Sequence, residues 1–296
     1  MAKIVPKRTT LLQKLAYIVR PFVVYMLVKN VVMFLLAIAV PSLPITGMTE
    51  WVERNANQLS AAVNSVASLV AVGFLLNDFL IEASTTGEVD IDNGVLKQFL
   101  IYIKNEFNGN RTAQKIIKLI LCVMLGITAS LAFNILIELM SARSGSDTML
   151  GSEKYEVVET IQYSVPIWLG IVLYGIISPV VEEIVFRGVI FNRIRKFYSV
   201  SKAVIFSALL FGMFHANLPQ FLYGTVMGML MALCYAYTES FAAPVLLHMS
   251  ANIFVFLISG LTTWSIVITT PVWCTVFMGL SIVLLFLVAH TKPQAV

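Results

Sequence analysis

The stretch Ser178-Pro-Val-Val-Glu-Glu-Ile-Val-Phe-Arg187 lies inside an apolar run that extends from Val165 to Phe191. It places two adjacent carboxylates, Glu182 and Glu183, and the guanidinium of Arg187 within a segment long enough to cross a bilayer as a helix. A charged group at that depth costs at least a few kcal/mol, and such groups persist in membrane segments where they are paired or functional. We therefore interpret Glu182 as a candidate catalytic base.

The composition of the whole chain is that of a membrane protein. Of its 296 residues, 58% are hydrophobic and only 12% are charged, whereas soluble globular proteins carry about 25% charged residues. The three cysteines lie far apart in apolar runs, which indicates neither a disulfide framework nor a cysteine metal site (Cys122, Cys234 and Cys274). No small-residue cleavage site follows the first apolar run, so we expect this run to stay as an anchor.

Eight apolar segments are long enough, or nearly so, to cross a bilayer as helices of about 20 residues. Their apolar residues run all the way round a helical period, which favours helices over a β-barrel. The predicted spans are residues 21–40, 60–82, 116–140, 162–190, 201–217, 219–238, 241–259 and 266–289. The sequence thus predicts an all-α, polytopic membrane helical bundle with about eight transmembrane helices, placed in the cell membrane.

The basic residues gather on one side of this bundle. With eight spans, 16 of the 20 Lys and Arg residues fall in the N-terminal arm, residues 97–118, residues 187–202 and the C-terminal tail. Because positive residues mark cytoplasmic loops, both termini are predicted to be cytoplasmic. The loop 142–160 on the other side is acidic, and Lys29 lies within the first span.

Residues 95–107 form a further helical segment that is too polar to span the membrane. Its apolar side chains share one helical face, with Lys97 and Lys104 off that face (Leu96, Phe99, Leu100, Ile103 and Phe107). This pattern predicts an amphipathic helix, which either lies on the cytoplasmic membrane surface or packs on the protein's own loops.

The two adjacent carboxylates point in different directions on a helix and therefore need different partners. Glu183 and Arg187 are four residues apart, so they are stacked on one helical face in the order that favours an ion pair. Glu182 points about 100° away and needs a partner from another helix.

Two histidines within spans are candidates for that partner, whereas His290 at the end of the last span is interpreted as structural. Glu183 lies 16 residues before Ser199, where the chain turns, and His215 lies 16 residues after it, so the two come level in a helical hairpin. His248 lies eight residues beyond Ser240 on the next inward span, about 12 Å deep. If the basic hairpin around Ser199 stands about 10 Å out of the membrane, these groups are expected to converge in the cytoplasmic half of the bundle.

Such a cluster can activate water. A carboxylate can act as a general base with an imidazole holding the water, and an amide with a second imidazole can donate to a developing oxyanion. The side chains of Glu182, His215 and His248 could instead hold a divalent metal such as zinc. Both routes lead to hydrolysis of an amide bond within the membrane. Buried pairs of this kind also occur as structural links or proton relays.

Three motifs occur in order, namely Glu182-Glu183-x-x-x-Arg187, Phe211-x-x-x-His215 and His248-x-x-x-Asn252. In this order and spacing they resemble the CPBP family of intramembrane proteases, which includes the Ras-converting CAAX endopeptidase and the bacterial Abi proteins. The resemblance covers about residues 162–258 of a single membrane domain, 1–296. The N-terminal spans and loops (1–160) and the last span (266–289) match no motif of the family.

The resemblance implies an eight-helix bundle whose site is open to the cytoplasm. Glu182 would activate water with His215, while His248 and Asn252 would bind the oxyanion. Glu183 and Arg187 would support these groups, and Phe211 would form a wall of the site. Because members of the family are described both as glutamate-dependent and as metalloproteases, both mechanisms stay open.

The first functional hypothesis is an intramembrane endopeptidase that acts on membrane-associated peptides or protein tails presented from the cytoplasmic side. Its expected partners are a peptide or membrane-protein substrate and the lipid bilayer, with no nucleic acid. The alternatives are a non-catalytic membrane scaffold or immunity protein, and a proton-coupled carrier with Glu182 and His215 as a relay. The carrier is less favoured because the two halves of the chain show no matching pair of broken helices.

Overall fold

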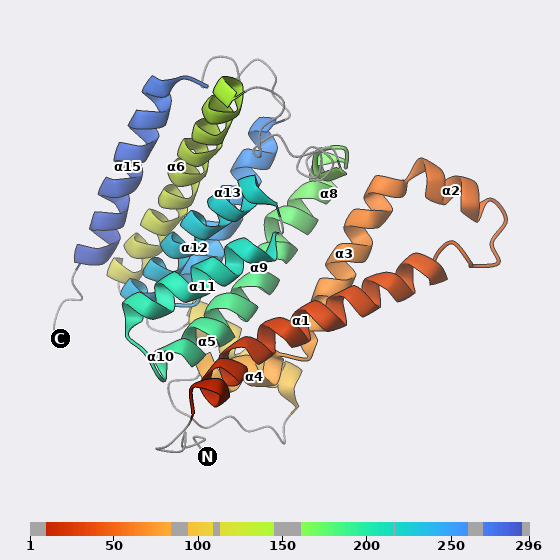
Figure 1. Ribbon diagram of the computed structural model, residues 1–296, viewed down its shortest axis with the longest axis horizontal. Coiled ribbons are helices and arrows are strands. Elements are labelled where there is room, and N and C mark those ends of the chain that lie inside the picture. The colour runs from red at the N-terminus through yellow and green to blue at the C-terminus, as the bar shows by residue number, and fades with distance from the viewer. Residues whose placement is uncertain are drawn as a thin grey trace.

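The computed structural model describes residues 10–83, 94–108, 113–144, 161–215, 217–259 and 269–291. Every regular element in these ranges is a helix, which confirms the prediction of an all-α polytopic bundle (Figure 1). The elements are α1 (Leu11–Ala39), α2 (Met48–Arg54), α3 (Ala56–Gly73), α4 (Leu76–Ala83), α5 (Val95–Asn108), α6 (Ala113–Ser144), α8 (Ile167–Gly170), η2 (Ile171–Ile177), α9 (Ser178–Glu183), η3 (Ile184–Phe191), α10 (Asn192–Arg195), α11 (Val200–Phe214), α12 (Leu218–Thr238), α13 (Ala242–Ser259) and α15 (Pro271–His290). The acidic loop 142–160 falls mostly outside the described residues.

The candidate spans coincide with the eight apolar segments of the sequence. Five described helices are long and apolar enough to cross a membrane, and α3 with α4 makes a sixth span if the pair, bent by 57°, is counted as one. The remaining two, α11 and α13, are apolar but shorter. The chain is therefore a multi-pass membrane protein, while the count of eight spans and the sides of the termini stay predictions.

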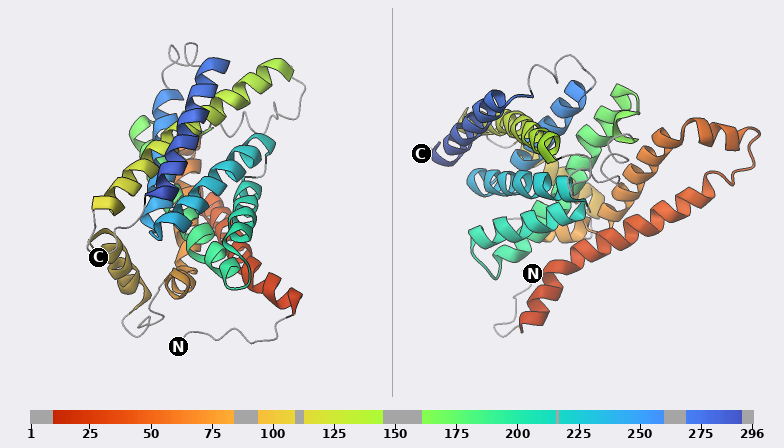
Figure 2. Two further views of the ribbon diagram at one scale, coloured as in Figure 1. Left: turned by 90° about the vertical axis from the view of Figure 1, so that its left-hand side faces the viewer. Right: turned by 45° about the horizontal axis from the view of Figure 1, so that its top comes forward.

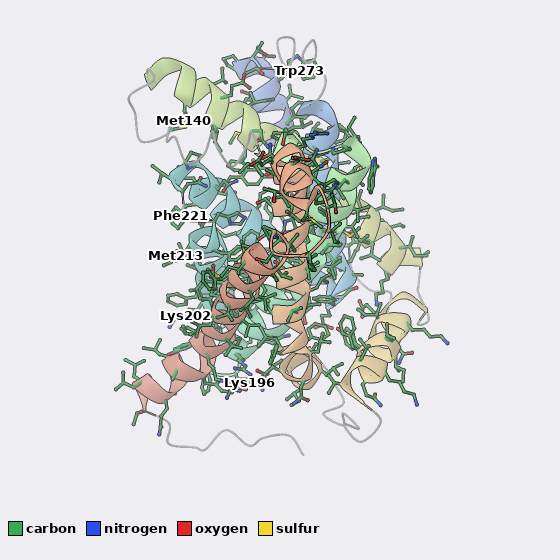
Figure 3. All side chains as sticks on the ribbon, turned by 90° about the vertical axis from the view of Figure 1, so that its right-hand side faces the viewer. Met140, Lys196, Lys202, Met213, Phe221 and Trp273 are labelled. Carbon is green, nitrogen blue, oxygen red and sulfur yellow. The ribbon has the colours of Figure 1, made fainter. Side chains whose placement is uncertain are left out.

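The helices divide into a packed bundle and an arm that leans away from it. The helix from α8 to α10 runs without a break from Ile167 to Arg195 and is here called span four. It packs against α11 and α13, with α6 and α15 side by side at the far edge (Figures 1 and 2). Helices α1, α2 and α3 form the arm. Figure 3 shows Lys196 and Lys202 at the lower end of the molecule, which we call the basic end.

A network of charges joins α1, α4 and α10 at the basic end. Arg193 donates to the Tyr17 carbonyl at 2.8 Å and pairs with Asp78 at 2.9 Å and Glu82 at 3.2 Å. Lys196 pairs with the second oxygen of Glu82 at 2.5 Å. Burial lowers the pKa of Lys196, but the hydrogen bond and the charge of Glu82 outweigh burial and raise this pKa above its ordinary value. The network fixes the arm against span four.

The amphipathic helix of the sequence is present as α5, and it packs on the bundle. The rings of Phe99 and Tyr102 lie 5.6 and 5.2 Å from the ring of Phe79 on α4. Leu96 and Leu100, from the same apolar face, remain 63% and 59% exposed. One edge of that face therefore packs on the protein, and membrane contact by the other edge stays a prediction.

We predict that Arg193→Met lowers the free energy of unfolding by about 2–4 kcal/mol, because it removes one of two cations from the buried Glu82 side chain and the partner of the partly buried Asp78. The matched control is Lys115→Met, which breaks a 3.7 Å pair to Glu106 in which the lysine is 32% exposed. That loss should be below about 1 kcal/mol. Reversible SDS titration in mixed micelles measures both, and equal losses would contradict the role of the network.

Candidate active site

The helix that carries the two carboxylates contains two π-helical stretches, η2 and η3, on either side of α9. In a π-helix each carbonyl accepts from the N–H five residues later, as Leu173 does from Ser178. The next carbonyl, that of Tyr174, would need the N–H of Pro179, which has none. Asn252 supplies the missing donor, because its Nδ2 donates to the Tyr174 carbonyl at 3.0 Å. Asn252 thus ties α13 to span four just before the carboxylates.

The predicted pair of Glu183 and Arg187 is present and fully buried. Nη1 of Arg187 donates to Oε1 of Glu183 at 2.8 Å, and Nη2 donates to the Gly228 carbonyl of α12 at 2.9 Å. The guanidinium also lies 4.7 Å from the ring centroid of Phe211 on α11. A Cβ at position 228 would stand 3.2 Å from Nη2, so a glycine there makes room for the arginine.

His248 stands between the two carboxylates. Its Nδ1 lies 3.0 Å from Oε1 of Glu183, and its Nε2 lies 3.8 Å from Oε2 of Glu182. The first distance is a hydrogen bond in which the imidazole donates to the carboxylate that Arg187 also holds. The second is too long for a direct bond but short enough for one water molecule to bond to both groups. The Glu183–Arg187 pair therefore orients His248 toward Glu182.

Glu182 is buried, with 7% of its surface exposed, and lines a cavity of about 590 Å³. Its Oε1 accepts a hydrogen bond from the Ser178 hydroxyl at 2.5 Å, and Oε2 faces His248. This carboxylate thus keeps one oxygen fixed by its own helix and offers the other to the cavity. Ser178 was not singled out from the sequence, although its spacing of four residues from Glu182 could have indicated it.

His215 lines the same cavity as Glu182, and its ring is held by its own helix. Its Nδ1 lies 3.0 Å from the Phe211 carbonyl, which only accepts, so in the neutral ring Nε2 carries the lone pair. Among the described residues, Glu182 accepts a hydrogen bond from Ser178 and lies 3.8 Å from His248, and His215 lines the same cavity. Counting residues on either side of the turn at Ser199 predicts that the carboxylates and His215 lie at one level. It does not predict which imidazole lies nearest to Glu182.

Lys29 of α1 also lines this cavity. Its Nζ lies 4.9 Å from the Phe214 ring centroid, and it forms no ion pair with any described residue. An ammonium in an apolar span is itself a signal of function, which the sequence carried. The structure places this cation in the same space as the Glu182 carboxylate.

The donor set does not fit a three-ligand metal site as it stands. Among the described residues, no three His, Cys, Asp or Glu side chains are grouped closely enough to hold a metal ion. We derive no step through a metal.

Comparison with known proteins agrees with the motifs. Residues 164–254 match the family described as Type II CAAX prenyl endopeptidase Rce1-like. YdiL of Bacillus subtilis (strain 168), named as a candidate membrane peptidase, is 34% identical over 104 residues, which are 35% of this chain and 42% of YdiL. The membrane-embedded CAAX protease MroQ of Staphylococcus aureus (strain USA300) is 32% identical over 110 residues, 35% of this chain and 44% of MroQ.

The matched part is thus less than half the length of either relative. No solved structure matches the chain significantly. The resemblance to the CPBP family that the three motifs indicate is confirmed over the matched segment.

We predict that Asn252→Leu destabilises the fold by about 1–3 kcal/mol, because it leaves the Tyr174 carbonyl buried without a donor. In a Pro179→Ala background the backbone N–H is restored, so the same substitution should cost less. SDS titration of the four proteins gives the coupling energy. The control is Asn192→Leu, which removes bonds from Nδ2 of Asn192 to Gly188 and Tyr235. Its effect on stability should be additive with that of Pro179→Ala. If Asn252→Leu also combined additively with Pro179→Ala, the assignment of Asn252 as the missing donor would be wrong.

Proposed function

We propose, on the premise that residues 164–254 form an Rce1-like domain, that this chain is an intramembrane endopeptidase. It would hydrolyse peptide bonds of membrane-associated peptides or protein tails. The observation that carries the proposal is one carboxylate, Glu182, held toward a cavity inside an apolar bundle beside an imidazole that a second, ion-paired carboxylate orients.

In the proposed reaction Glu182 is the general base. Water bound between its Oε2 and His248 loses a proton to the carboxylate while its oxygen attacks the scissile carbonyl carbon. A C–O bond forms, and the carbonyl electron pair moves onto oxygen. When the tetrahedral intermediate collapses, the C–N bond breaks and Glu182 returns the proton to the leaving nitrogen. The products are a carboxylate and an amine.

The neighbouring groups have distinct proposed roles. His215 presents Nε2 to the cavity, where it can hold the water from a second direction. Asn252 uses one amide hydrogen on the Tyr174 carbonyl and keeps the other for a developing oxyanion. His248 adds a second donor, at Nε2, only in its doubly protonated form, because Nδ1 of the neutral ring already donates to Glu183. Glu183 and Arg187 are positioning residues, because they act through His248.

We predict that Glu182→Gln lowers kcat for cleavage of a fluorogenic transmembrane peptide by about 10²-fold or more, because a neutral amide cannot accept the proton. His215→Ala should also lower kcat. Glu53→Gln, an exposed carboxylate on α2, is the control for a charge change away from the cavity. All variants are compared in folded detergent preparations. Cleavage by Glu182→Gln at the wild-type rate would refute the base assignment.

The same variants separate the competing functions. A scaffold or immunity protein would be inert in the cleavage assay, and its cellular phenotype would survive Glu182→Gln. A carrier would couple substrate uptake to protons in sealed vesicles without cleaving the peptide.

We predict that cleavage persists after chelator treatment and that active preparations contain metal well below one ion per chain. The reason is the donor geometry, because no three His, Cys, Asp or Glu side chains among the described residues are grouped closely enough to hold a metal ion. Elemental analysis of wild type and His248→Ala, made alongside the cleavage assay, provides the measurement. Near-stoichiometric metal that is lost in His248→Ala would establish a metal-assisted reaction instead.

A further inference from the structure

Five carboxamide side chains line the cavity together with the catalytic candidates. They come from five separate segments, namely Asn30 of α1, Asn64 of α3, Asn134 of α6, Gln162 ahead of α8 and Gln220 of α12. Polar side chains within membrane spans are costly unless they face a partner or a water-filled space. Five of them from five segments around one cavity indicate a polar, hydrated lining.

These amides keep hydrogen-bonding capacity for a ligand. Nδ2 of Asn30 donates to the Met26 carbonyl at 2.7 Å, and Nδ2 of Asn134 donates to the Ser130 carbonyl at 2.8 Å. Both bonds stay within the residue's own helix and leave each Oδ1 as an acceptor. In Gln220 the oxygen is used and the nitrogen is left, because Oε1 accepts from Asn217 at 2.6 Å and Nε2 remains as a donor. The lining therefore offers neutral donors and acceptors, which match the N–H and C=O groups of a peptide backbone.

The amides lie far from the basic end. Nζ of Lys118 donates to the Tyr237 carbonyl at 3.1 Å, so α6 and α12 are level at that point. Asn134 lies 16 residues from Lys118, and Gln220 lies 17 residues from Tyr237. These separations correspond to about 24 Å and about 26 Å along the helix axes. The hydrocarbon core of a bilayer is about 30 Å thick, so both amides belong to the half opposite the basic end.

The arm and the figure agree with this placement. Asn30 lies 13 residues, or about 20 Å, along α1 from Tyr17, whose carbonyl Arg193 holds. In Figure 3, Phe221, the neighbour of Gln220, lies well above Lys196 toward the opposite end. Glu182 lies 11 residues, or about 16 Å, along span four from Arg193, so the carboxylate is slightly nearer to the basic end than Asn30 is.

We propose that the five amides form a vestibule through which an extended peptide reaches Glu182 from the side of the membrane opposite the basic end. Since basic loops mark the cytoplasm, that side is extracytoplasmic. The substrate class is then a peptide or protein tail exposed outside the cytoplasm, bound through its backbone and with tolerance for its side chains. The catalytic consequence rests on the proposed function, whereas the direction of the opening does not.

The cavity then opens on the side opposite to the cytoplasmic side that the family resemblance implies. The hairpin arithmetic fixes the level at which Glu182 and His215 meet, but it does not indicate toward which side the cavity widens. Two of the amides supply that information, because Asn134 and Gln220 come from the ends of α6 and α12 that are remote from the basic loops.

Cysteine labelling in membranes tests the direction without any need for activity. The three native cysteines are buried and are first replaced by alanine (Cys122, Cys234 and Cys274). Gln220→Cys and Asn134→Cys then report on the vestibule. Lys104→Cys, exposed on α5 at the basic end, is the control for the other side. A membrane-impermeant maleimide is applied to intact cells and to inverted vesicles.

We expect the two vestibule cysteines to react in intact cells and the Lys104→Cys protein to react only in inverted vesicles. Reaction of the vestibule cysteines only in inverted vesicles would overturn the proposed direction. Failure to react from either side would overturn a water-filled vestibule. Because labelling requires no cleavage, an inert protein in the peptide assay with outward labelling would refute the proposed function alone.

Peptide binding is tested by protection of the same cysteine. A mixture of random-sequence decapeptides should slow maleimide labelling of Gln220→Cys severalfold, because the amides bind the backbone. An equal mass of free amino acids is the control and should not slow it. Equal labelling rates with both would overturn the vestibule as a peptide site.

Discussion

The buried ion pair between Glu183 and Arg187 is the interaction on which the site depends. Both groups are fully withdrawn from solvent, and an unpaired charge in that position would be strongly destabilising. The pair is held in turn by Gly228 of α12, the ring of Phe211 on α11 and Nδ1 of His248 on α13. One salt bridge therefore fixes the relative positions of four helices, and the geometry of the candidate site follows from them.

That constraint gives the two adjacent carboxylates different environments. Glu183 is neutralised within the protein, so it serves to orient His248. Glu182 faces the cavity, where Lys29 is the additional positive group. Adjacent residues on a helix point in directions about 100° apart, so this division is a direct consequence of helical geometry. A carboxylate kept apart from the internal ion pair is available to exchange a proton.

The sequence predicted the parts of this arrangement that depend on local periodicity. The four-residue spacing of Glu183 and Arg187 was sufficient for their pairing, and the apolar segments were sufficient for the helical bundle. Contacts that depend on register between helices could not be read in the same way. The bond from Asn252 to Tyr174 arises only because a π-helical register sets Pro179 opposite that carbonyl, and no spacing rule indicates such a register.

A hydrolase inside a membrane must bring two polar reactants, water and a peptide bond, into an apolar bundle. The ion pair does not serve this purpose, because both of its side chains are fully buried between the helices and neither lines the cavity. Neutral amides can, because they hydrate a cavity without adding charges that would need partners of their own. In the proposed hydrolase, a buried charged pair therefore orients the site, while amides in the lining of the cavity give water and a peptide bond a polar surface.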